Sequence, residues 1–208
     1  HRLRSEAVST GGGAPTRPFD QAFGMSQDSH LDRLSLPPVF SRKDALGRGL
    51  AQSALESPRV SRELYGYYSR SGFEVNVASV ARAVVAKIPR SFVSHQTAAL
   101  IHGISLPQYV DLEIPWISRE RGSRALRVAG IRSCSVKHVE LDTAVIDGTL
   151  TSTPARLFLE MARELSHEDL VALGDQIVRV PRKRYEGRSE PFATRGDLHE
   201  MLLAHPRS

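Results

Sequence analysis

Two segments near the middle of the chain have the apolar spacing of α-helices. Between residues 77 and 88, the apolar side chains that share one helical stripe are Val80, Val84, Val85 and Ile88. The next segment starts with Ser94, which can cap free helical amides, continues through Ala98-Ala99-Leu100-Ile101, and stops at Gly103, which suits a left-handed end. We therefore predict two helices, over 77–88 and 94–103.

Strand-like alternation comes after these helices. Val, Ile, Leu and Thr alternate with other residues over 110–117, 125–139 and 144–151, and Asp147-Gly148 is a strong hairpin signal. Thr153-Pro154 and a capping box opened by Ser166 then predict two further helices, over 155–165 and 170–180. This part of the chain is expected to be helices around a small sheet, an α+β fold.

Near the N-terminus, the residue pattern changes at about residue 35. Residues 1–35 combine glycine, proline, serine and threonine without a periodic apolar pattern, so we predict a disordered tail. Next come a Ser41-Arg42-Lys43-Asp44 helix start, a glycine turn, a short helix over 51–56 and an aromatic ribbon over 60–69 that bends at a glycine. This order predicts a winged helix-turn-helix domain over 36–72, followed by an α+β effector or antitoxin-like domain over 73–208.

The balance of charge favours an anionic partner. The chain has 28 Lys and Arg against 23 Asp and Glu, a net charge of +5, and the cations gather in 39–70 and in 179–188. In a winged helix-turn-helix, a short helix contacts base edges and the flanking ribbon contacts phosphates, so duplex DNA is the predicted partner. The candidate base-contacting residues are Gln52 and Ser53, and the candidate phosphate-contacting residues are Arg42, Lys43, Arg48, Arg59 and Arg62. The alternative is that these side chains form an ordinary solvated surface.

Cysteine content and hydropathy argue against a disulfide-bonded, membrane-spanning or secreted protein. Cys134 is the single cysteine, so no internal disulfide can form, and we expect its thiol to behave as a small buried hydrophobe. No apolar run has the length of a membrane span, and residues 1–30 lack the apolar centre of a signal peptide. We predict a cytoplasmic protein with no membrane partner.

The histidines do not form a metal motif. His95 and His102 lie seven residues apart, and no cysteine pair or His-Glu-x-x-His run supplies the converging ligands that zinc needs. We interpret them as packing and helix-end residues, where a cationic histidine suits the helix dipole. No metal or other cofactor is predicted.

Enzymatic interpretations are also weak. In the nearest match to a restriction-type nuclease strand, Asp111-Leu112-Glu113-Ile114-Pro115, proline stands where the lysine should be. A hydrolase built on Ser94 and His95, with Asp142 as orienting group, lacks a Gly-x-Ser-x-Gly elbow, and neighbours on one helix are expected to point apart. Asp142 and Asp147 are more simply turn-forming residues. We predict that the chain is not an enzyme.

Two motifs carry a resemblance to a known family. The segments 92–103, Phe-Val-Ser-His-Gln-Thr-Ala-Ala-Leu-Ile-His-Gly, and 150–159, Leu-Thr-Ser-Thr-Pro-Ala-Arg-Leu-Phe-Leu, resemble the AbiEi-like type IV antitoxins. They are also similar to related actinobacterial proteins in which this region precedes a Vsr-like endonuclease domain. The resemblance covers about 38–205 and includes the winged helix entry, and the nuclease domain of those relatives is not within this sequence.

The resemblance implies a DNA-binding transcriptional autoregulator, an antitoxin-like component of a toxin–antitoxin system. It also implies a nucleotidyltransferase-like toxin as a partner. One alternative is the DNA-targeting region of a Vsr-like endonuclease whose catalytic domain is missing. A further alternative is a protein-interaction module whose winged helix no longer binds DNA.

Overall fold

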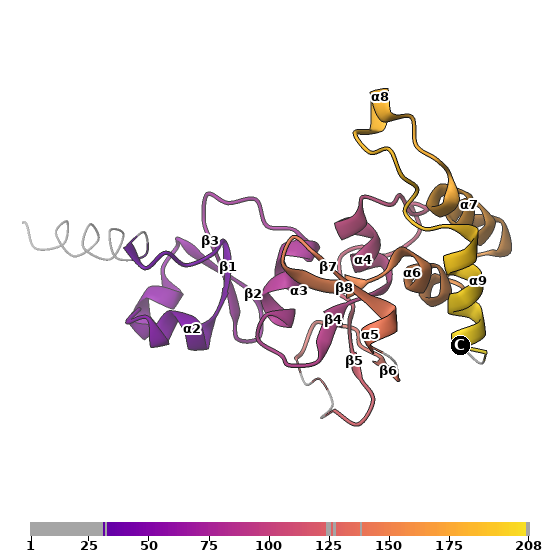
Figure 1. Ribbon diagram of the computed structural model, residues 1–208. Coiled ribbons are helices and arrows are strands. Elements are labelled where there is room, and N and C mark those ends of the chain that lie inside the picture. The colour runs from indigo at the N-terminus through magenta and orange to yellow at the C-terminus, as the bar shows by residue number, and fades with distance from the viewer. Residues whose placement is uncertain (1–30, 32, 124–125, 127, 138, 207–208) are drawn as a thin grey trace, which may run out of the picture. The chain divides into compact units, whose positions relative to one another are not determined.

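Two β-sheets and several helices make up the part of the chain that the computed structural model describes, namely residues 31, 33–123, 126, 128–137 and 139–206 (Figure 1). The mixed α+β class agrees with the expectation from sequence. Leu36–Ser208 form one compact unit, which holds both sheets. Most of the predicted disordered tail, 1–35, lies outside the described residues.

The first sheet is built from the front of this unit. β1 (Val39–Ser41) is followed by helix α2 (Arg42–Gly47), the 3-10 turn η1 (Gln52–Glu56), β2 (Val60–Leu64) and β3 (Tyr67–Arg70). The strand order is β1-β3-β2, and both pairings are antiparallel. The predicted short helix at 51–56 is therefore a tight 3-10 turn, and the predicted ribbon over 60–69 is confirmed.

The second sheet has the strand order β6-β5-β4-β8-β7. Its strands are β4 (Ser91–Val93), β5 (Ile117–Glu120), β6 (Ser135–Val136), β7 (Thr143–Ile146) and β8 (Thr149–Ser152). β4 pairs with β8, and β5 with β6, in parallel, while the remaining pairs are antiparallel. The β7–β8 hairpin turns at Asp147 (φ 48°) and Gly148 (φ 74°), both left-handed, so this turn prediction is confirmed.

Some helices contact the second sheet directly, and others pack on those helices or project from them. They are α3 (Val77–Val85), α4 (His95–His102), α5 (Val139–Asp142), α6 (Pro154–Met161), α7 (His167–Val178), α8 (Lys183–Glu186) and α9 (Arg195–Ala204). Thr153 Oγ1 accepts the amide of Arg156 at the start of α6, and Ser166 Oγ accepts that of Asp169 in α7. These two caps were predicted from the sequence.

The strand predictions over 110–117 and 125–139 were wrong in their extent. Residues 110–116 form a loop that contains Pro115, which has no amide hydrogen to donate to a sheet. Among the described residues of the later segment, Ser135–Val136 form a strand, and Arg132 forms an isolated β-bridge with Trp116. Gly130 (φ 87°) lies at a turn within the later segment, and Gly122 (φ 87°) lies at a turn between the two segments.

In the described part of the chain, two apolar clusters of the core connect the helices and the two sheets. One joins α4, α6, α7 and α9 around residues such as Leu157, Met161 and Ile177. The other contains Tyr67 of the first sheet, Val84 of α3, and residues of β4 and β5. Because α3 packs on the first sheet, the described parts of 36–72 and 73–208 share a core. That each of these two ranges is a domain able to fold by itself stays a prediction.

Glu160 caps helix α4, although Ser94 was predicted to do so. The Glu160 carboxylate is buried and accepts hydrogen bonds from the His95 amide (2.8 Å), Arg156 Nε (3.1 Å) and Ser152 Oγ (2.9 Å). Ser94 instead places its hydroxyl 2.7 Å from that of Ser118. Ser94 therefore holds the N-cap position as predicted, but its hydroxyl makes no capping hydrogen bond because it contacts Ser118, and the Glu160 carboxylate takes the first helical amide.

Asp142 is not a turn former. Its carboxylate is fully buried, 3.3 Å from Arg156 Nη1 and 2.8 Å from His205 Nε2. Arg156 thus lies between Asp142 and Glu160, and the three form a buried ionic cluster that joins α5, α6 and, through His205, the end of α9. Since the Asp142 carboxylate is directed at Arg156 and His205, it does not orient the His95 ring.

The expectation of cationic helix-end histidines was also wrong. His95 adopts φ 52° and stacks on Trp116 with ring centroids 4.0 Å apart, and burial lowers its pKa to about 4. His102 donates from Nε2 to the Ser152 carbonyl (2.7 Å), and burial lowers its pKa as well. Both rings are neutral near pH 7.

Two smaller expectations fail in the same region. Ser94 Oγ and His95 Nδ1 lie 3.2 Å apart, not pointing apart, because Ser94 is extended and His95 is left-handed. Cys134 is half-buried and its Sγ lies 2.9 Å from Ser118 Oγ, so its contact is polar. Burial raises the pKa of this thiol.

Candidate nucleic-acid interface

Helix α2 presents two cations on its outer side. Ser41 Oγ accepts the Asp44 amide (3.1 Å), which starts the helix as predicted, and Ala45 on the inner side is fully buried. Arg42 and Lys43 are exposed. The cap and the buried alanine therefore fix which face of α2 meets solvent.

The 3-10 turn η1 is anchored by its second half. Ala54 and Leu55 are buried, while Gln52 and Ser53 are exposed. Arg42 Nη2 donates to Gln52 Oε1 at 2.8 Å, so the first residue of α2 holds the side chain of the first residue of η1.

The β2–β3 turn lies against α2. The Arg42 amide donates to the Gly66 carbonyl (2.8 Å), and Gly66 has φ 81°, a conformation that favours glycine. The neighbouring Tyr65 is 72% exposed, and the Arg62 guanidinium lies 5.1 Å from the centroid of its ring. A backbone bond thus fixes an aromatic–cationic pair beside α2.

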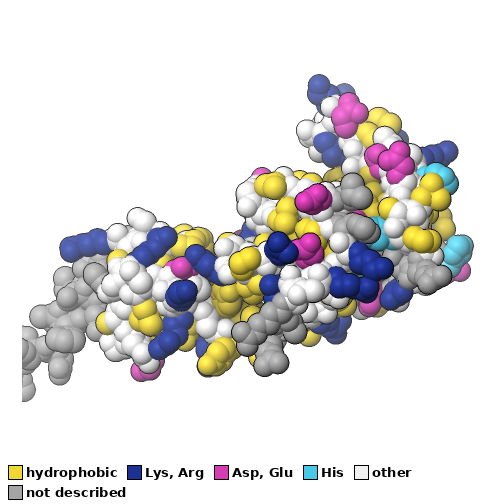
Figure 2. Space-filling view, turned by 60° about the horizontal axis from the view of Figure 1, so that its bottom comes forward, with side chains coloured by type: hydrophobic (Ala, Val, Ile, Leu, Met, Phe, Trp, Pro, Cys, Tyr) yellow, Lys and Arg dark blue, Asp and Glu magenta, His cyan; other side chains and the backbone are white. Residues whose placement is uncertain are grey.

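A hollow of about 750 Å³ lies between these elements. Its lining includes four cations, Arg42, Lys43, Arg62 and Lys87, one carboxylate, Asp44, and three tyrosines at and after the turn, Tyr65, Tyr67 and Tyr68. We call this the cationic groove. Figure 2 shows Lys and Arg side chains gathered on the part of the surface that carries the first sheet and α2.

Lys87 was missed by the sequence analysis. It lies just after α3 and forms a 2.8 Å ion pair with Asp44, and this contact lowers the pKa of the Asp44 carboxyl. Lys87 lies 43 residues after Asp44 in the chain, and the packing of α3 on the first sheet brings it to the groove. No local motif marks such a residue.

All seven residues predicted to contact DNA are exposed, but they do not form one cluster. Arg42, Lys43 and Arg62 line the cationic groove, and Gln52 is joined to it through Arg42. Ser53, Arg48 and Arg59 are not among the lining residues.

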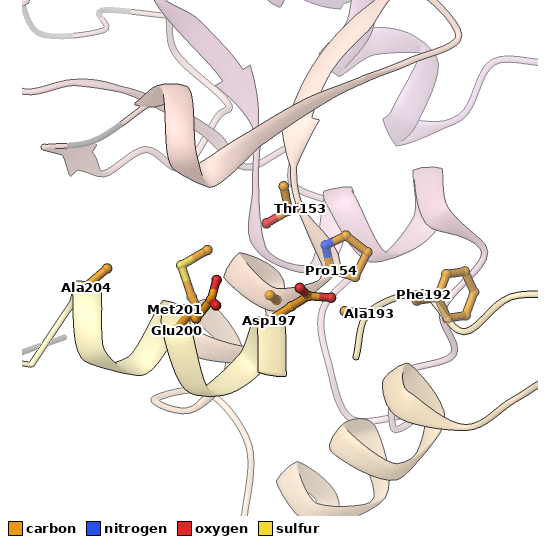
Figure 3. Close-up of a pocket in the computed structure, with 9 residues that line it drawn as sticks. Thr153, Pro154, Phe192, Ala193, Asp197, Glu200, Met201 and Ala204 are labelled. Carbon is orange, nitrogen blue, oxygen red and sulfur yellow. The ribbon is translucent and has the colours of Figure 1, made fainter. Parts of the chain in front are cut away.

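A second hollow, of about 420 Å³, lies between the start of α6 and α9 (Figure 3). Its lining is largely apolar but includes the carboxylates of Asp197 and Glu200. Asp197 also accepts the Thr194 amide (2.7 Å) at the start of α9. Because negative charge repels phosphate, this hollow is unsuited to a nucleic-acid backbone.

Neither a metal centre nor a membrane span is found in the described ranges. These residues contain no group of three or more His, Cys, Asp or Glu side chains placed to hold a metal ion. None of the helices in this part of the chain combines the length and the apolar character that crossing a membrane requires.

The fold has a counterpart among solved structures. It is similar to the crystal structure of the Rv2827c protein from Mycobacterium tuberculosis, with a TM-score of 0.58 and 15% sequence identity. The match covers 88% of this chain and 71% of that chain. No protein-family profile matches the chain, and no curated protein matches it. At 15% identity the likeness concerns the fold alone.

Proposed function

We propose that this chain binds duplex DNA and acts as a transcriptional autoregulator, an antitoxin-like component of a type IV toxin–antitoxin system in the cytoplasm. The observation that carries the proposal is the cationic groove, which is lined by four Lys and Arg side chains and three tyrosines and is joined to η1 by the hydrogen bond from Arg42 to Gln52. Phosphate contacts supply most of the affinity of DNA-binding proteins, and such contacts come largely from Arg and Lys.

In this proposal, residues 36–72 act as a winged helix-turn-helix. The order of strand, helix, short helix and hairpin supports this assignment, as does the sheet order β1-β3-β2, which places the hairpin beside the first strand. η1 takes the place of the recognition helix. With five residues it is short, so base contacts would be confined to Gln52 and Ser53.

The hydrogen bond from Arg42 leaves Gln52 able to contact a base. A glutamine contacts adenine with its carbonyl oxygen and its amide nitrogen together, and the oxygen can accept a second hydrogen bond beside the one from Arg42 Nη2. In this proposal, Arg42 contacts a phosphate and also orients the Gln52 amide toward the base.

The test uses a labelled duplex from the region upstream of the gene, and a mixed-sequence duplex of the same length. The triple variant R42A/K43A/R62A removes three cations from the groove. The matched control R121A/K137A/R163A removes three exposed cations outside it. The logarithm of the DNA-binding constant falls linearly with the logarithm of the salt concentration, and we call the steepness of this fall the salt slope. Loss of three phosphate contacts should reduce the salt slope by about 2–3 and weaken binding about 100-fold at about 0.15 M salt.

The control variant should bind like the wild type. Equal loss in both variants would mean that only net charge matters, and would contradict a groove-specific interface. A wild-type protein that binds neither duplex would contradict the proposed function as a whole.

The family and the partner are proposals from resemblance. The segments 92–103 and 150–159 support membership of the AbiEi-like antitoxins, and with it a nucleotidyltransferase-like toxin as the partner. Co-expression with the product of the neighbouring gene tests this assignment. If that product is not a nucleotidyltransferase-like protein, or does not inhibit growth when expressed alone, the antitoxin assignment is wrong, and DNA binding is decided separately by the duplex assay.

A further inference from the structure

The connection between α7 and α9 forms a projecting arm. After α7 the chain runs through the buried Pro181, forms the single turn of α8, and turns back at Gly187, which has φ 69°. It rejoins the helical layer where the Phe192 amide donates to the Ile177 carbonyl (3.0 Å). Figure 1 shows α8 at the outer end of this connection.

The Glu186 carboxylate stabilises the conformation of the arm. Its two carboxylate oxygens accept from Arg179 Nη1 and Nη2 at 2.7 and 2.8 Å, a bidentate pair. The Arg182 amide (3.1 Å) and Arg188 Nη2 (3.3 Å) donate to the same carboxylate. These donors lower the pKa of Glu186 to about 2, so it stays ionised at neutral pH.

The outer turn of the arm carries three consecutive cations, Arg182, Lys183 and Arg184, which we call the cationic tip. All three are exposed, and within the described ranges none of their charged nitrogens lies within 4.0 Å of a carboxylate oxygen. Tyr185 is 74% exposed, and its ring centroid lies 5.8 Å from the Arg184 guanidinium. Glu186 thus neutralises the arginines at the base of the arm and leaves the charges of the tip without a carboxylate partner.

We propose that the cationic tip is a second contact for the phosphate backbone of duplex DNA, separate from the cationic groove. This inference rests on the proposed function. Cations without carboxylate partners on an ordered turn are complementary to a polyanion, and an aromatic side chain among them is typical of nucleic-acid-binding surfaces. An acidic protein is the less favoured partner. Protein–protein interfaces usually have an apolar centre that is poor in lysine, and the cationic tip has no apolar centre.

The test measures binding of the full chain to the upstream duplex across a series of salt concentrations. The variant R182A/K183A/R184A should reduce the salt slope by about 2–3 and weaken binding about 100-fold at about 0.15 M salt. Thermal unfolding should be unchanged, because the three side chains are exposed. The triple R121A/K137A/R163A again serves as the charge-matched control.

Comparison with the groove variant R42A/K43A/R62A separates this inference from the proposed function. If the groove variant loses binding while the tip variant matches the control, the tip inference is overturned and the proposed function stands. If the tip variant binds duplex normally but no longer binds poly-L-glutamate, the tip contacts an acidic protein and the DNA assignment is overturned. If the wild type binds no duplex, both proposals fail.

Discussion

Acidification should destabilise this protein through His95, whose ring is buried against Trp116 next to the ionic cluster. The ring stacks at 4.0 Å on Trp116, and its Nδ1 lies 3.2 Å from Ser94 Oγ and 3.8 Å from a Glu160 oxygen. Burial is the largest effect on its pKa and lowers it from 6.5 to about 4, outweighing the attraction of Glu164. The unfolded chain therefore binds a proton at a pH where the folded chain does not.

The sign and size of the effect depend on that difference in pKa. Because the folded-state pKa is the lower one, stability is fully present above pH 6.5 and falls as the pH decreases from 6.5 toward 4. At about pH 5 the unfolded state is almost fully protonated at this site and the folded state is mostly neutral. The linkage between proton binding and folding then lowers the free energy of unfolding by about 2 kcal/mol between about pH 7.5 and about pH 5, from His95 alone.

The assay is urea unfolding at these two pH values, followed by the fluorescence of Trp116, the single tryptophan. His95→Asn is the test variant, because asparagine tolerates the left-handed φ of 52° at this position. In this variant, the difference between the free energies of unfolding at the two pH values should be about 2 kcal/mol smaller than in the wild type, whatever the stability at the higher pH. His199→Asn, at an exposed helix position, should leave the dependence intact. Identical pH dependence in wild type and His95→Asn would refute the assignment to His95.

Three further predictions concern single positions. Gly130→Ala should cost about 1–3 kcal/mol in urea unfolding, because its Cβ would lie 2.7 Å from Leu64 Cδ2 at φ 87°. Gly122→Ala has the same φ and open space around it, so an equal cost in both would contradict the packing part of this prediction. Glu186→Ala should accelerate trypsin cleavage within the α7–α9 connection, and an unchanged rate would mean that the carboxylate does not order the arm. Lys87→Ala should reduce the salt slope of DNA binding by less than the value of about 0.9 for a full phosphate contact, because Asp44 already pairs with the Lys87 ammonium, and it should cost under about 1 kcal/mol of stability, since that ion pair is partly exposed. A reduction of about 0.9 would contradict the argument that the Asp44 pair withholds Lys87 from phosphate.

Local signals in the sequence predicted local structure well. Ser41, Thr153 and Ser166 each accept the helical amide expected of them, because a cap depends on residues only three positions apart. The Asp147-Gly148 turn was found for the same reason, since two adjacent residues with left-handed backbone determine it. The exposure of the candidate DNA-contacting side chains was also predictable, because charged and polar side chains favour solvent.

Features that depend on distant residues could not be predicted. The cap of α4 comes from Glu160, 65 positions after His95, and the groove cation Lys87 comes from the chain just after α3. Asp142 looked like a turn residue because it precedes a hairpin, yet its partners Arg156 and His205 lie 14 and 63 positions away. A buried charge needs a partner, but one sequence does not say where that partner is.

The placement of carboxylates decides which cations can meet an anionic ligand. A net charge of +5 in 208 residues is modest and does not by itself identify a binding surface. At the arm, Glu186 pairs with two arginines at the base and leaves the three tip cations without a carboxylate. At the groove, Asp44 pairs with Lys87, while Arg42 is held by the uncharged amide of Gln52, a contact that costs little to give up. Gln52→Glu should therefore weaken DNA binding by more than its charge alone predicts, because the new carboxylate would also hold Arg42 in an ion pair.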